Sequence, residues 1–244
     1  MTLYSSKKAN NNSLFKIINF TSSTIGTAPL CIITTRAAGS MGSNISPKDE
    51  KRNKIMDILG IDKIVSLIQE HTDIVFDSKE IDSNSIIGDG IITLEKKVLA
   101  VTVADCLPIF LYDSKNNAYG IVHSGWKGTG IALNAVNKML ACYGTKPEDI
   151  HIAIGPSIGK CCYSVDRERA LNFALKWGNN TIIEKKSSYF LDLKKANKLM
   201  LENAGVKNIT IDKNCTCCNS EFHSYRRDGA EGFGLMLALI GYFR

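Results

Sequence analysis

Apolar residues along the chain gather in short runs, rich in β-branched side chains, between glycine, proline and polar turns. Such runs are typical of strands. The pattern predicts strands at residues 29–35, 98–103, 109–112, 119–123, 150–154, 189–193 and 208–211. Two shorter apolar runs, 64–68 and 74–76, flank Gln69, Glu70 and His71. A turn at 113–117 indicates that the strands on either side of it are antiparallel partners.

Helical signals alternate with these strands. Ser46 and Pro47 suit the start of a helix, and Gly60 suits its end. From Ile131 to Leu140 the apolar residues recur at helical spacing, and further helices are predicted at about 167–177 and before Gly205. Since hairpins are mixed with this alternation, we predict an α/β (α+β-like) fold, a sandwich of mixed β-sheet with packed helices.

No repeat or linker divides the chain. We therefore expect a polar N-terminal leader at residues 1–25 and a single catalytic domain at 26–244. Of the 244 residues, 44% are apolar and 22% are charged, which is typical of a soluble globular protein. The net charge of +6 is spread along the chain, which is compatible with an anionic ligand but does not favour nucleic-acid binding.

The chain shows neither a run of roughly 18 apolar residues nor a secretory signal, so we expect a cytoplasmic protein without a membrane partner. In that compartment, its eight cysteines are interpreted as free thiols, metal ligands or catalytic groups and not as a disulfide framework. There are only four histidines, which excludes an ordinary multicopper oxidase.

Three residues that carry chemistry stand at predicted strand breaks. Cys106 interrupts an apolar strand, His123 ends the strand that returns beside it, and His71 lies at another break. One cysteine and two histidines make a sound zinc shell with a fourth position for water or substrate. The alternative is a simple buried thiol beside ordinary strand-end histidines. Spacing alone favours that alternative, because no two of these residues form a short metal motif.

Other candidates concern anions and thiols. The glycine-rich stretch 123–130 joins a strand to a helix and offers backbone N–H groups to an anion, but it matches neither the P-loop nor the dinucleotide pattern. Arg226 and Arg227 could clamp a phosphate or pair with Asp228. Cys161-Cys162 and 215–218 (CTCC), with His223 nearby, suggest a structural zinc or a redox dithiol. We rank free thiols ahead of both.

Several stretches resemble, in order, the motifs of the YfiH/LACC1 family, also called laccase-domain or polyphenol oxidoreductase-like proteins. They are 35–36 (TR), 69–71 (QEH), 89–93 (DGIIT), 101–108 (VTVADCLP), 123–128 (HSGWKG), 154–159 (IGPSIG) and 222–229 (FHSYRRDG). The resemblance runs from about residue 30 to the C-terminus.

The resemblance implies a cysteine-hydrolase-like α/β sandwich and a zinc site that falls on His71, Cys106 and His123, with copper as the alternative metal. It implies phosphorolysis of adenosine, inosine, guanosine and 5′-methylthioadenosine, together with adenosine deamination. Purine nucleosides and inorganic phosphate are then the partners, and the chain is expected to be a monomer or homodimer. For phosphate we select Arg36, which precedes the glycine-containing loop, and Arg226.

Three positions depart from the family pattern, which bears on substrate preference and phosphate contacts. Thr72 stands where the family usually has glycine, Lys127 where arginine is common, and Phe233 where an arginine often follows glycine. Two other functions stay open. One is a Cys-His hydrolase or deamidase with Cys106 as nucleophile and His123 as base, and the other is a copper-dependent polyphenol oxidoreductase.

Overall fold

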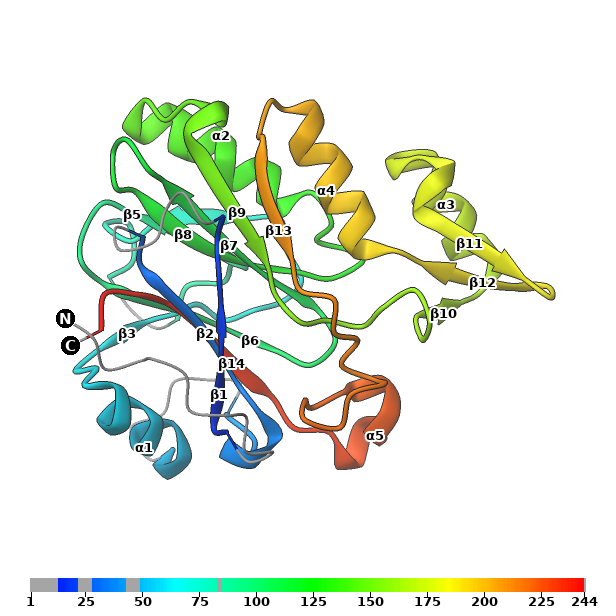
Figure 1. Ribbon diagram of the computed structural model, residues 1–244, viewed down its shortest axis with the longest axis horizontal. Helices are drawn as coiled ribbons and strands as arrows, with labels where there is room; N and C mark the ends of the chain where they lie inside the picture. The colour runs from blue at the N-terminus through cyan, green and yellow to red at the C-terminus, as the bar shows by residue number, and fades with distance from the viewer. Residues whose placement is uncertain (1–12, 22–27, 43–48, 83–84, 244) are drawn as a thin grey trace.

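The computed structural model describes residues 13–21, 28–42, 49–82 and 85–243. Two β-sheets pack face to face, with helices α2 (Ile131–Tyr143) and α4 (Leu193–Asn203) outside one sheet and α1 (Glu50–Leu59) outside the other (Figure 1). The molecule is therefore a four-layer α/β/β/α sandwich. Mixed sheets with packed helices were predicted and are confirmed; the cysteine-hydrolase-like comparison stays a prediction.

The six-stranded sheet underlies α2 and α4. Its strands, in spatial order, are β13 (Asn208–Ile211), β9 (Ile150–Ile154), β7 (Leu107–Asp113), β8 (Tyr119–Ser124), β5 (Gly90–Thr93) and β4 (Val75–Asp77). The pairs β13–β9 and β4–β5 are parallel, and the other pairs are antiparallel. The hairpin predicted around the turn 113–117 is the β7–β8 pair.

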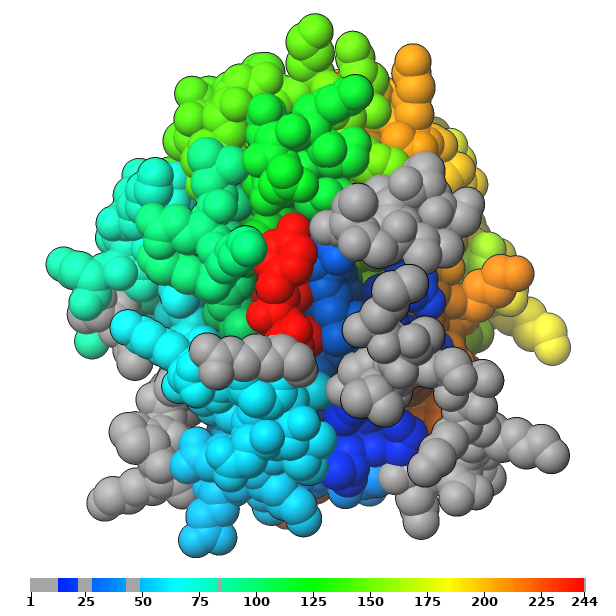
Figure 2. All heavy atoms as spheres, turned by 60° about the vertical axis from the view of Figure 1, so that its left-hand side comes forward, coloured from blue at the N-terminus to red at the C-terminus, as the bar shows by residue number. Residues whose placement is uncertain are grey.

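The five-stranded sheet underlies α1. In spatial order it contains β1 (Phe15–Ile18), β2 (Leu30–Thr34), β14 (Met236–Gly241), β6 (Val98–Val103) and β3 (Ile64–Val65). Figure 2 shows the red C-terminal segment between the blue N-terminal segment and the green central segment, which agrees with the place of β14 between β2 and β6. Strands from the N-terminal and C-terminal parts of the chain thus pair within one sheet.

The continuous apolar strands follow from burial on both faces. In β7, Leu107, Ile109 and Leu111 pack against the helices, whereas Phe110 and Tyr112 pack between the two sheets. A strand covered on both faces reads as an unbroken apolar run, not as an alternation. For this reason β6, β7, β8 and β9 were predicted from the sequence alone.

Helix ends follow local capping chemistry. The cap of α1 is Asp49, whose carboxylate accepts the backbone N–H of Arg52, while Ser46 and Pro47 lie outside the described residues. Gly60 ends α1 in the left-handed conformation with φ +63°, as predicted. Burying α1 against the five-stranded sheet then forms the third apolar layer.

Several elements that depend on distant partners were not predicted from the sequence. Residues 15–18, inside the expected polar leader, form β1 and pair with β2. No element was predicted for β5, β14, the helix α5 (Tyr225–Gly232), β10 (Ser164–Val165) or β11 (Ile182–Lys185). Strands of two to four residues, here β5, β10 and β11, have little periodicity of their own, and long-range pairing decides their existence.

A smaller unit lies beside the sandwich (Figure 1). It consists of α3 (Arg167–Trp177) and a three-stranded sheet in the order β10, β12 (Ser188–Leu191), β11. The chain enters this unit directly after the loop that follows β9. No helix in the described part of the chain is long and apolar enough to cross a membrane.

Candidate metal centre

The three residues selected at strand breaks come together at one end of the six-stranded sheet. Cys106 directly precedes β7, His123 lies at the end of β8, and His71 precedes β4. Their ligand atoms all lie within 4.8 Å of one another, and Cys106 Sγ is 3.8 Å from His71 Nε2. Zinc bonds of about 2.0–2.3 Å to sulfur and nitrogen place ligand atoms roughly 3.3–3.8 Å apart. The donor set and its spacing therefore fit a single metal ion.

Asp89, which the sequence analysis did not select as a site residue, orients this cluster. Its fully buried carboxylate accepts a hydrogen bond from His123 Nδ1 at 2.7 Å. It also accepts the backbone N–H groups of Glu70, His71 and Thr72 and the hydroxyl of Thr72. Because Nδ1 of His123 is occupied, its Nε2 is the atom left for a metal. The threonine that departs from the family pattern is part of this network.

The electrostatics favour a thiolate at Cys106. Burial raises the pKa of Cys106, but the charge of His123 and hydrogen bonds from both histidines outweigh it and bring the pKa to about 6. Burial lowers the pKa of His123, but the charge of Cys106 and the hydrogen bond to Asp89 raise it to about 9. Without a metal, the pair is thus a thiolate and an imidazolium at neutral pH, and a metal ion held by His123 Nε2 would take the place of the imidazolium proton.

Close packing and unusual backbone conformations surround the cluster. A Cβ on Gly125 would lie 3.0 Å from Cys106 Sγ and 3.1 Å from His71 Cδ2, so a side chain there would crowd two of the three candidate ligands. His71 and Asp105 have φ of +60° and +83°, which side-chain-bearing residues rarely adopt. Such conformations persist where surrounding contacts enforce them, and they concentrate at functional sites.

Asp105, the residue before Cys106, has both carboxylate oxygens occupied. Oδ1 accepts the hydroxyl of Thr216 at 2.6 Å, and Oδ2 accepts the backbone N–H of Arg226 at 2.7 Å. Its carbonyl accepts the N–H of Ile158. These contacts indicate that Asp105 orients the loop carrying Cys106.

The two arginines selected for phosphate already have protein partners. Arg36 is half-exposed and lies 3.3 Å from an oxygen of Asp228. Arg226 donates to the carbonyl of Cys162 and to the hydroxyl and carbonyl of Ser164. Their role in phosphate binding stays a prediction, and an anion at either side chain would compete with these contacts. The guanidinium of Arg227 instead donates to the carbonyls of Thr216 and Phe222 and so stabilises the loop between them.

Aromatic rings with guanidinium groups stacked on them flank the cluster. Trp126 follows Gly125, and the guanidinium of Arg169 lies 4.7 Å from its ring centroid. The guanidinium of Arg226 lies 5.5 Å from the ring of Tyr163. Arg226 also donates its backbone N–H to Asp105, the residue before Cys106, which links this ring to the loop of the cluster. His71 is exposed and His123 is buried, so the cluster opens to solvent on the side of His71.

The other two histidines lie apart from the cluster. His151 hydrogen-bonds Thr21 at 2.7 Å, and His223 is buried beneath Gly234. The described residues therefore bring two of the four histidines, His71 and His123, together.

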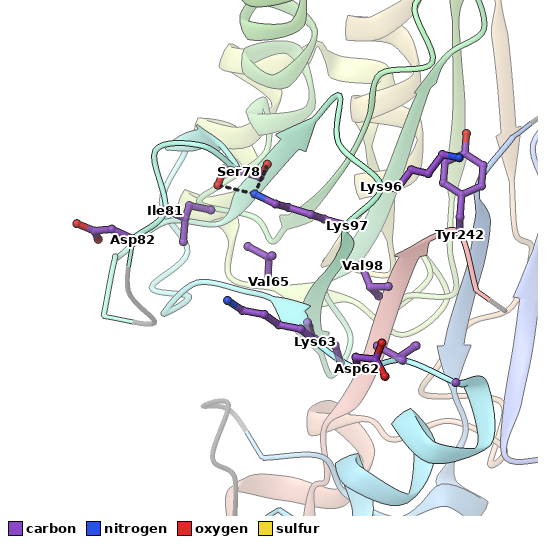
Figure 3. A pocket seen from close by; sticks show the side chains of 13 residues that line it. Asp62, Lys63, Val65, Ser78, Ile81, Asp82, Lys96, Lys97, Val98 and Tyr242 are labelled. Atoms are coloured by element: carbon purple, nitrogen blue, oxygen red, sulfur yellow. Dashed lines mark hydrogen bonds between the residues drawn. The ribbon is translucent and has the colours of Figure 1, made fainter.

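A cavity of about 360 Å³ lies elsewhere, between β3, β6 and the segment after β4 (Figure 3). Lys63, Lys96, Lys97 and Tyr242 are among the residues that line it, and Lys97 donates to Ser78. None of the residues of the metal cluster lines this cavity. The candidate chemistry is thus at the open end of the sheet and not in this cavity.

Named relatives include the purine nucleoside phosphorylase LACC1 of Mus musculus, 38% identical over 162 residues, or 62% of this chain and 37% of that protein. The purine nucleoside phosphorylase YlmD of Bacillus subtilis is 40% identical over 164 residues, 63% of this chain and 58% of that protein. A purine nucleoside phosphorylase of Clostridium acetobutylicum is 32% identical over 84% of this chain and 88% of its own. The first two matches thus span between a third and three fifths of those relatives.

Solved structures have the same fold. YfiH of Bacillus licheniformis superposes with a TM-score of 0.77 at 30% identity, covering 90% of this chain and 98% of that one. YlmD of Geobacillus stearothermophilus gives 0.79 at 30% identity, covering 89% and 93%. Residues 38–242 match the family described as multi-copper polyphenol oxidoreductase laccase, and the chain therefore belongs to that family.

Proposed function

We propose that this protein is a zinc-dependent purine nucleoside phosphorylase whose metal is held by His71, Cys106 and His123. The observation that carries the proposal is the convergence of these three ligand atoms within 4.8 Å, with Asp89 fixing the tautomer of His123. The relatives named purine nucleoside phosphorylase supply the reaction class. The substrates are adenosine, inosine, guanosine and 5′-methylthioadenosine.

In phosphorolysis, a phosphate oxygen forms a bond to C1′ of the ribose while the bond from C1′ to the purine nitrogen breaks. The leaving purine needs a proton, and the incoming dianion needs cationic donors. A zinc ion at the trio would supply a Lewis acid at the open end of the sheet.

Side chains near the metal cluster are proposed to bind the purine and the phosphate. Tyr163 and Trp126 offer aromatic faces for a purine, and Arg226 and Arg169 offer guanidinium groups for a phosphate. Arg36 is the third cation proposed for the anion. The buried His123–Asp89 pair holds its geometry during turnover because every oxygen of Asp89 has donors.

The test is incubation of the zinc-loaded chain with each nucleoside, with and without phosphate, followed by identification of the products. We expect free base and ribose 1-phosphate only when phosphate is present, and methylthioribose 1-phosphate from 5′-methylthioadenosine. Adenosine deamination, proposed as a second activity, gives inosine without phosphate. Cys142→Ala is the matched control for Cys106→Ala, because Cys142 is an exposed thiol on α2 outside the cluster. Equal activity of the two variants would contradict the proposal.

A Cys-His hydrolase is the second candidate function, because Cys106 and His123 form a thiolate–imidazolium pair without a metal. Zinc discriminates the two functions, since a coordinated thiolate is a poor nucleophile. Activity that rises when a chelator removes zinc would favour the hydrolase. Copper-dependent oxidation of phenols follows only from the family's description and is tested by oxygen uptake of the copper-loaded chain.

A further inference from the structure

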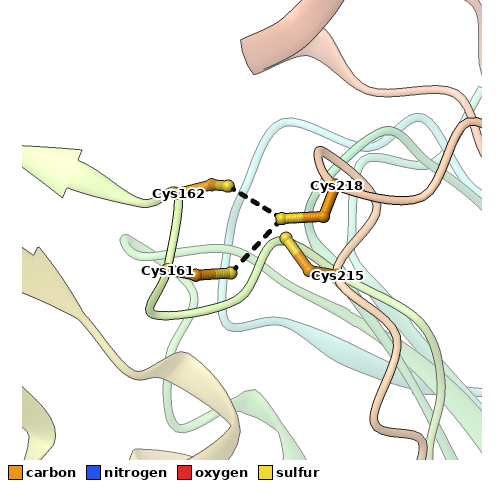
Figure 4. Close-up of side chains that lie close together, drawn as sticks. All are labelled: Cys161, Cys162, Cys215 and Cys218. Atoms are coloured by element: carbon orange, nitrogen blue, oxygen red, sulfur yellow. Dashed lines mark hydrogen bonds between the residues drawn. The ribbon is translucent and has the colours of Figure 1, made fainter.

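Four cysteine sulfurs from two distant segments meet at a second place in the fold. Cys161 and Cys162 follow the loop after β9, whereas Cys215 and Cys218 follow β13 (Figure 4). All four Sγ atoms lie within 4.8 Å of one another. Cys218 Sγ is 3.6 Å from Cys161 Sγ and 3.3 Å from Cys162 Sγ. His223, grouped with these cysteines from the sequence, is not part of this cluster.

These separations distinguish between the chemistries open to four thiols. A disulfide joins its sulfurs at about 2.05 Å, so the cysteines are not bonded in pairs. Zinc bound to four thiolates at about 2.3 Å places the sulfurs roughly 3.8 Å apart, in the middle of the observed range. An iron–sulfur cluster interposes several iron and sulfide ions and needs its cysteines farther apart. The geometry suits one tetrahedral ion.

The backbone on both sides is folded around the sulfurs. The N–H of Gly159 donates to Cys215 Sγ at 3.1 Å. A Cβ on Gly159 would lie 3.1 Å from Cys161 Sγ and 3.2 Å from Cys215 Cβ, so the glycine lets the two turns approach. Backbone N–H groups aimed at a sulfur stabilise its thiolate, which is the form that binds a metal.

We propose that Cys161, Cys162, Cys215 and Cys218 bind one structural zinc ion. All four tetrahedral positions are filled by the chain, so no position remains for water or substrate, as in structural zinc sites. Four thiolates and one Zn²⁺ carry a net charge of −2, and the ammonium of Lys194, which donates to the carbonyl of Asn214 beside Cys215 at 2.8 Å, offsets part of it. The exposed edges at Cys161 and Cys218 give the ion a path of entry.

The site connects two loops that support the first metal centre. Thr216, between two of the ligands, donates its hydroxyl to Asp105 at 2.6 Å. The carbonyl of Cys162 accepts from the side chain of Arg226 at 2.9 Å. A zinc ion here therefore fixes the loop that places Cys106, without touching substrate.

Elemental analysis of the full chain, purified from zinc-containing medium, tests the proposal. We expect two zinc ions per chain, and Cys218→Ser is expected to lose one of them and to lower the melting temperature. Cys217→Ser is the matched control, because it lies in the same turn but its sulfur is not one of the four. It should keep both ions. Equal zinc content in Cys218→Ser and Cys217→Ser would overturn the proposal.

The test is independent of the proposed function. If the first centre binds no zinc, His71→Ala leaves the zinc content unchanged, while the loss in Cys218→Ser persists. Should Cys218→Ser fail to fold, cobalt substitution of the unaltered chain decides. Four thiolates give tetrahedral Co²⁺ an intense near-ultraviolet charge-transfer band, which a site with a single thiolate gives only weakly. A weak band, or iron in place of zinc in the purified chain, would overturn the assignment.

Discussion

Asp89→Asn tests how the chain prepares His123 for a metal. The carboxylate of Asp89 accepts five hydrogen bonds, from His123 Nδ1, the N–H groups of Glu70, His71 and Thr72, and the hydroxyl of Thr72. Burial raises the pKa of Asp89, but the hydrogen bonds from His123 and Thr72 outweigh it, and the pKa lies below its ordinary value. The native group is therefore an acceptor on both oxygens.

An asparagine has one acceptor oxygen in place of two. Three of the five donors face Oδ2, so the amide oxygen is expected to take that side and the NH₂ to face His123. The NH₂ group of the asparagine and the Nδ1–H of His123 are both donors and would then face each other. The imidazole avoids this by moving its proton from Nδ1 to Nε2, the atom that faces the metal position. Loss of one charge-assisted hydrogen bond costs about 1.5–3 kcal/mol. Changes to such supporting groups reduce metal affinity by about 10–100-fold, or about 1.4–2.8 kcal/mol, so the two figures agree.

Competition with a chromophoric chelator measures the zinc affinity of Asp89→Asn, and the melting temperature reports its stability. Asp113→Asn is the matched control. Asp113 is equally buried and also accepts backbone, amide and hydroxyl donors, but it lies at the far end of β7. The control should lose stability and keep its zinc affinity. If both variants bind zinc as tightly as the unaltered chain, Asp89 does not set the tautomer of His123.

Four further outcomes are expected. Cys106→Ala should abolish turnover and retain the circular dichroism of the fold, whereas Cys142→Ala should keep both; activity in the first variant would remove Cys106 from the mechanism. Gly125→Ala should weaken zinc binding in the chelator assay, because its methyl group would lie 3.0 Å from Cys106 Sγ, and an unchanged affinity would contradict the crowding. Arg36→Ala or Arg226→Ala should raise the KM for phosphate more than that for nucleoside; unchanged phosphate dependence in both would place the anion elsewhere. In the metal-free chain, alkylation of Cys106 by iodoacetamide should accelerate as pH rises through about 6, because the thiolate is the reactive form and its pKa is about 6. A midpoint near the ordinary thiol value of about 8.5 would show that the imidazoles do not stabilise the thiolate.

The sequence predicts those parts of the fold whose signal is local. Strands β6 to β9 are continuous apolar runs because both of their faces are buried, and Gly60 ends α1 by its own backbone preference. The pairing of β14 with β2 joins residues about two hundred positions apart, such as Ala238 and Ile33. No local pattern carries that contact.

In the candidate site too, some residues could be predicted from the sequence and others could not. Strand breaks made a cluster of His71, Cys106 and His123 possible, because each break leaves a side chain at the end of the sheet, but only the family resemblance favoured it over a buried thiol with ordinary histidines. Asp89 was missed because an aspartate before a glycine reads as an ordinary turn. Its sequence signals are its place in the stretch 89–93 (DGIIT), which resembles the family, and its position before β5, whose first residue, Gly90, pairs with Val122 beside His123.

The spacing of the residues in the four-cysteine cluster explains why they were predicted to be free thiols. Cys215 and Cys218 have metal-ligand spacing, but their partners Cys161 and Cys162 come from another part of the chain. The parallel bridge between Ser157 and Cys215 brings the two segments together. Cys215 and Cys218 meet Cys161 and Cys162 only because β13 lies beside β9 in the six-stranded sheet.

Asp105 links the four-cysteine cluster to the cluster of His71, Cys106 and His123. The hydrogen bonds that make this link also account for its strained backbone. One oxygen accepts the hydroxyl of Thr216, from the turn that carries Cys215 and Cys218, and the other accepts the backbone N–H of Arg226, the second residue of α5. These bonds hold Asp105 at φ +83°, a conformation that costs about 1–3 kcal/mol when unsupported. Because Cys106 is the next residue, the direction of its thiol depends on that conformation. The cysteine-rich turn is thus part of the structure that aims Cys106 at the two histidines, although it lies outside the reacting centre.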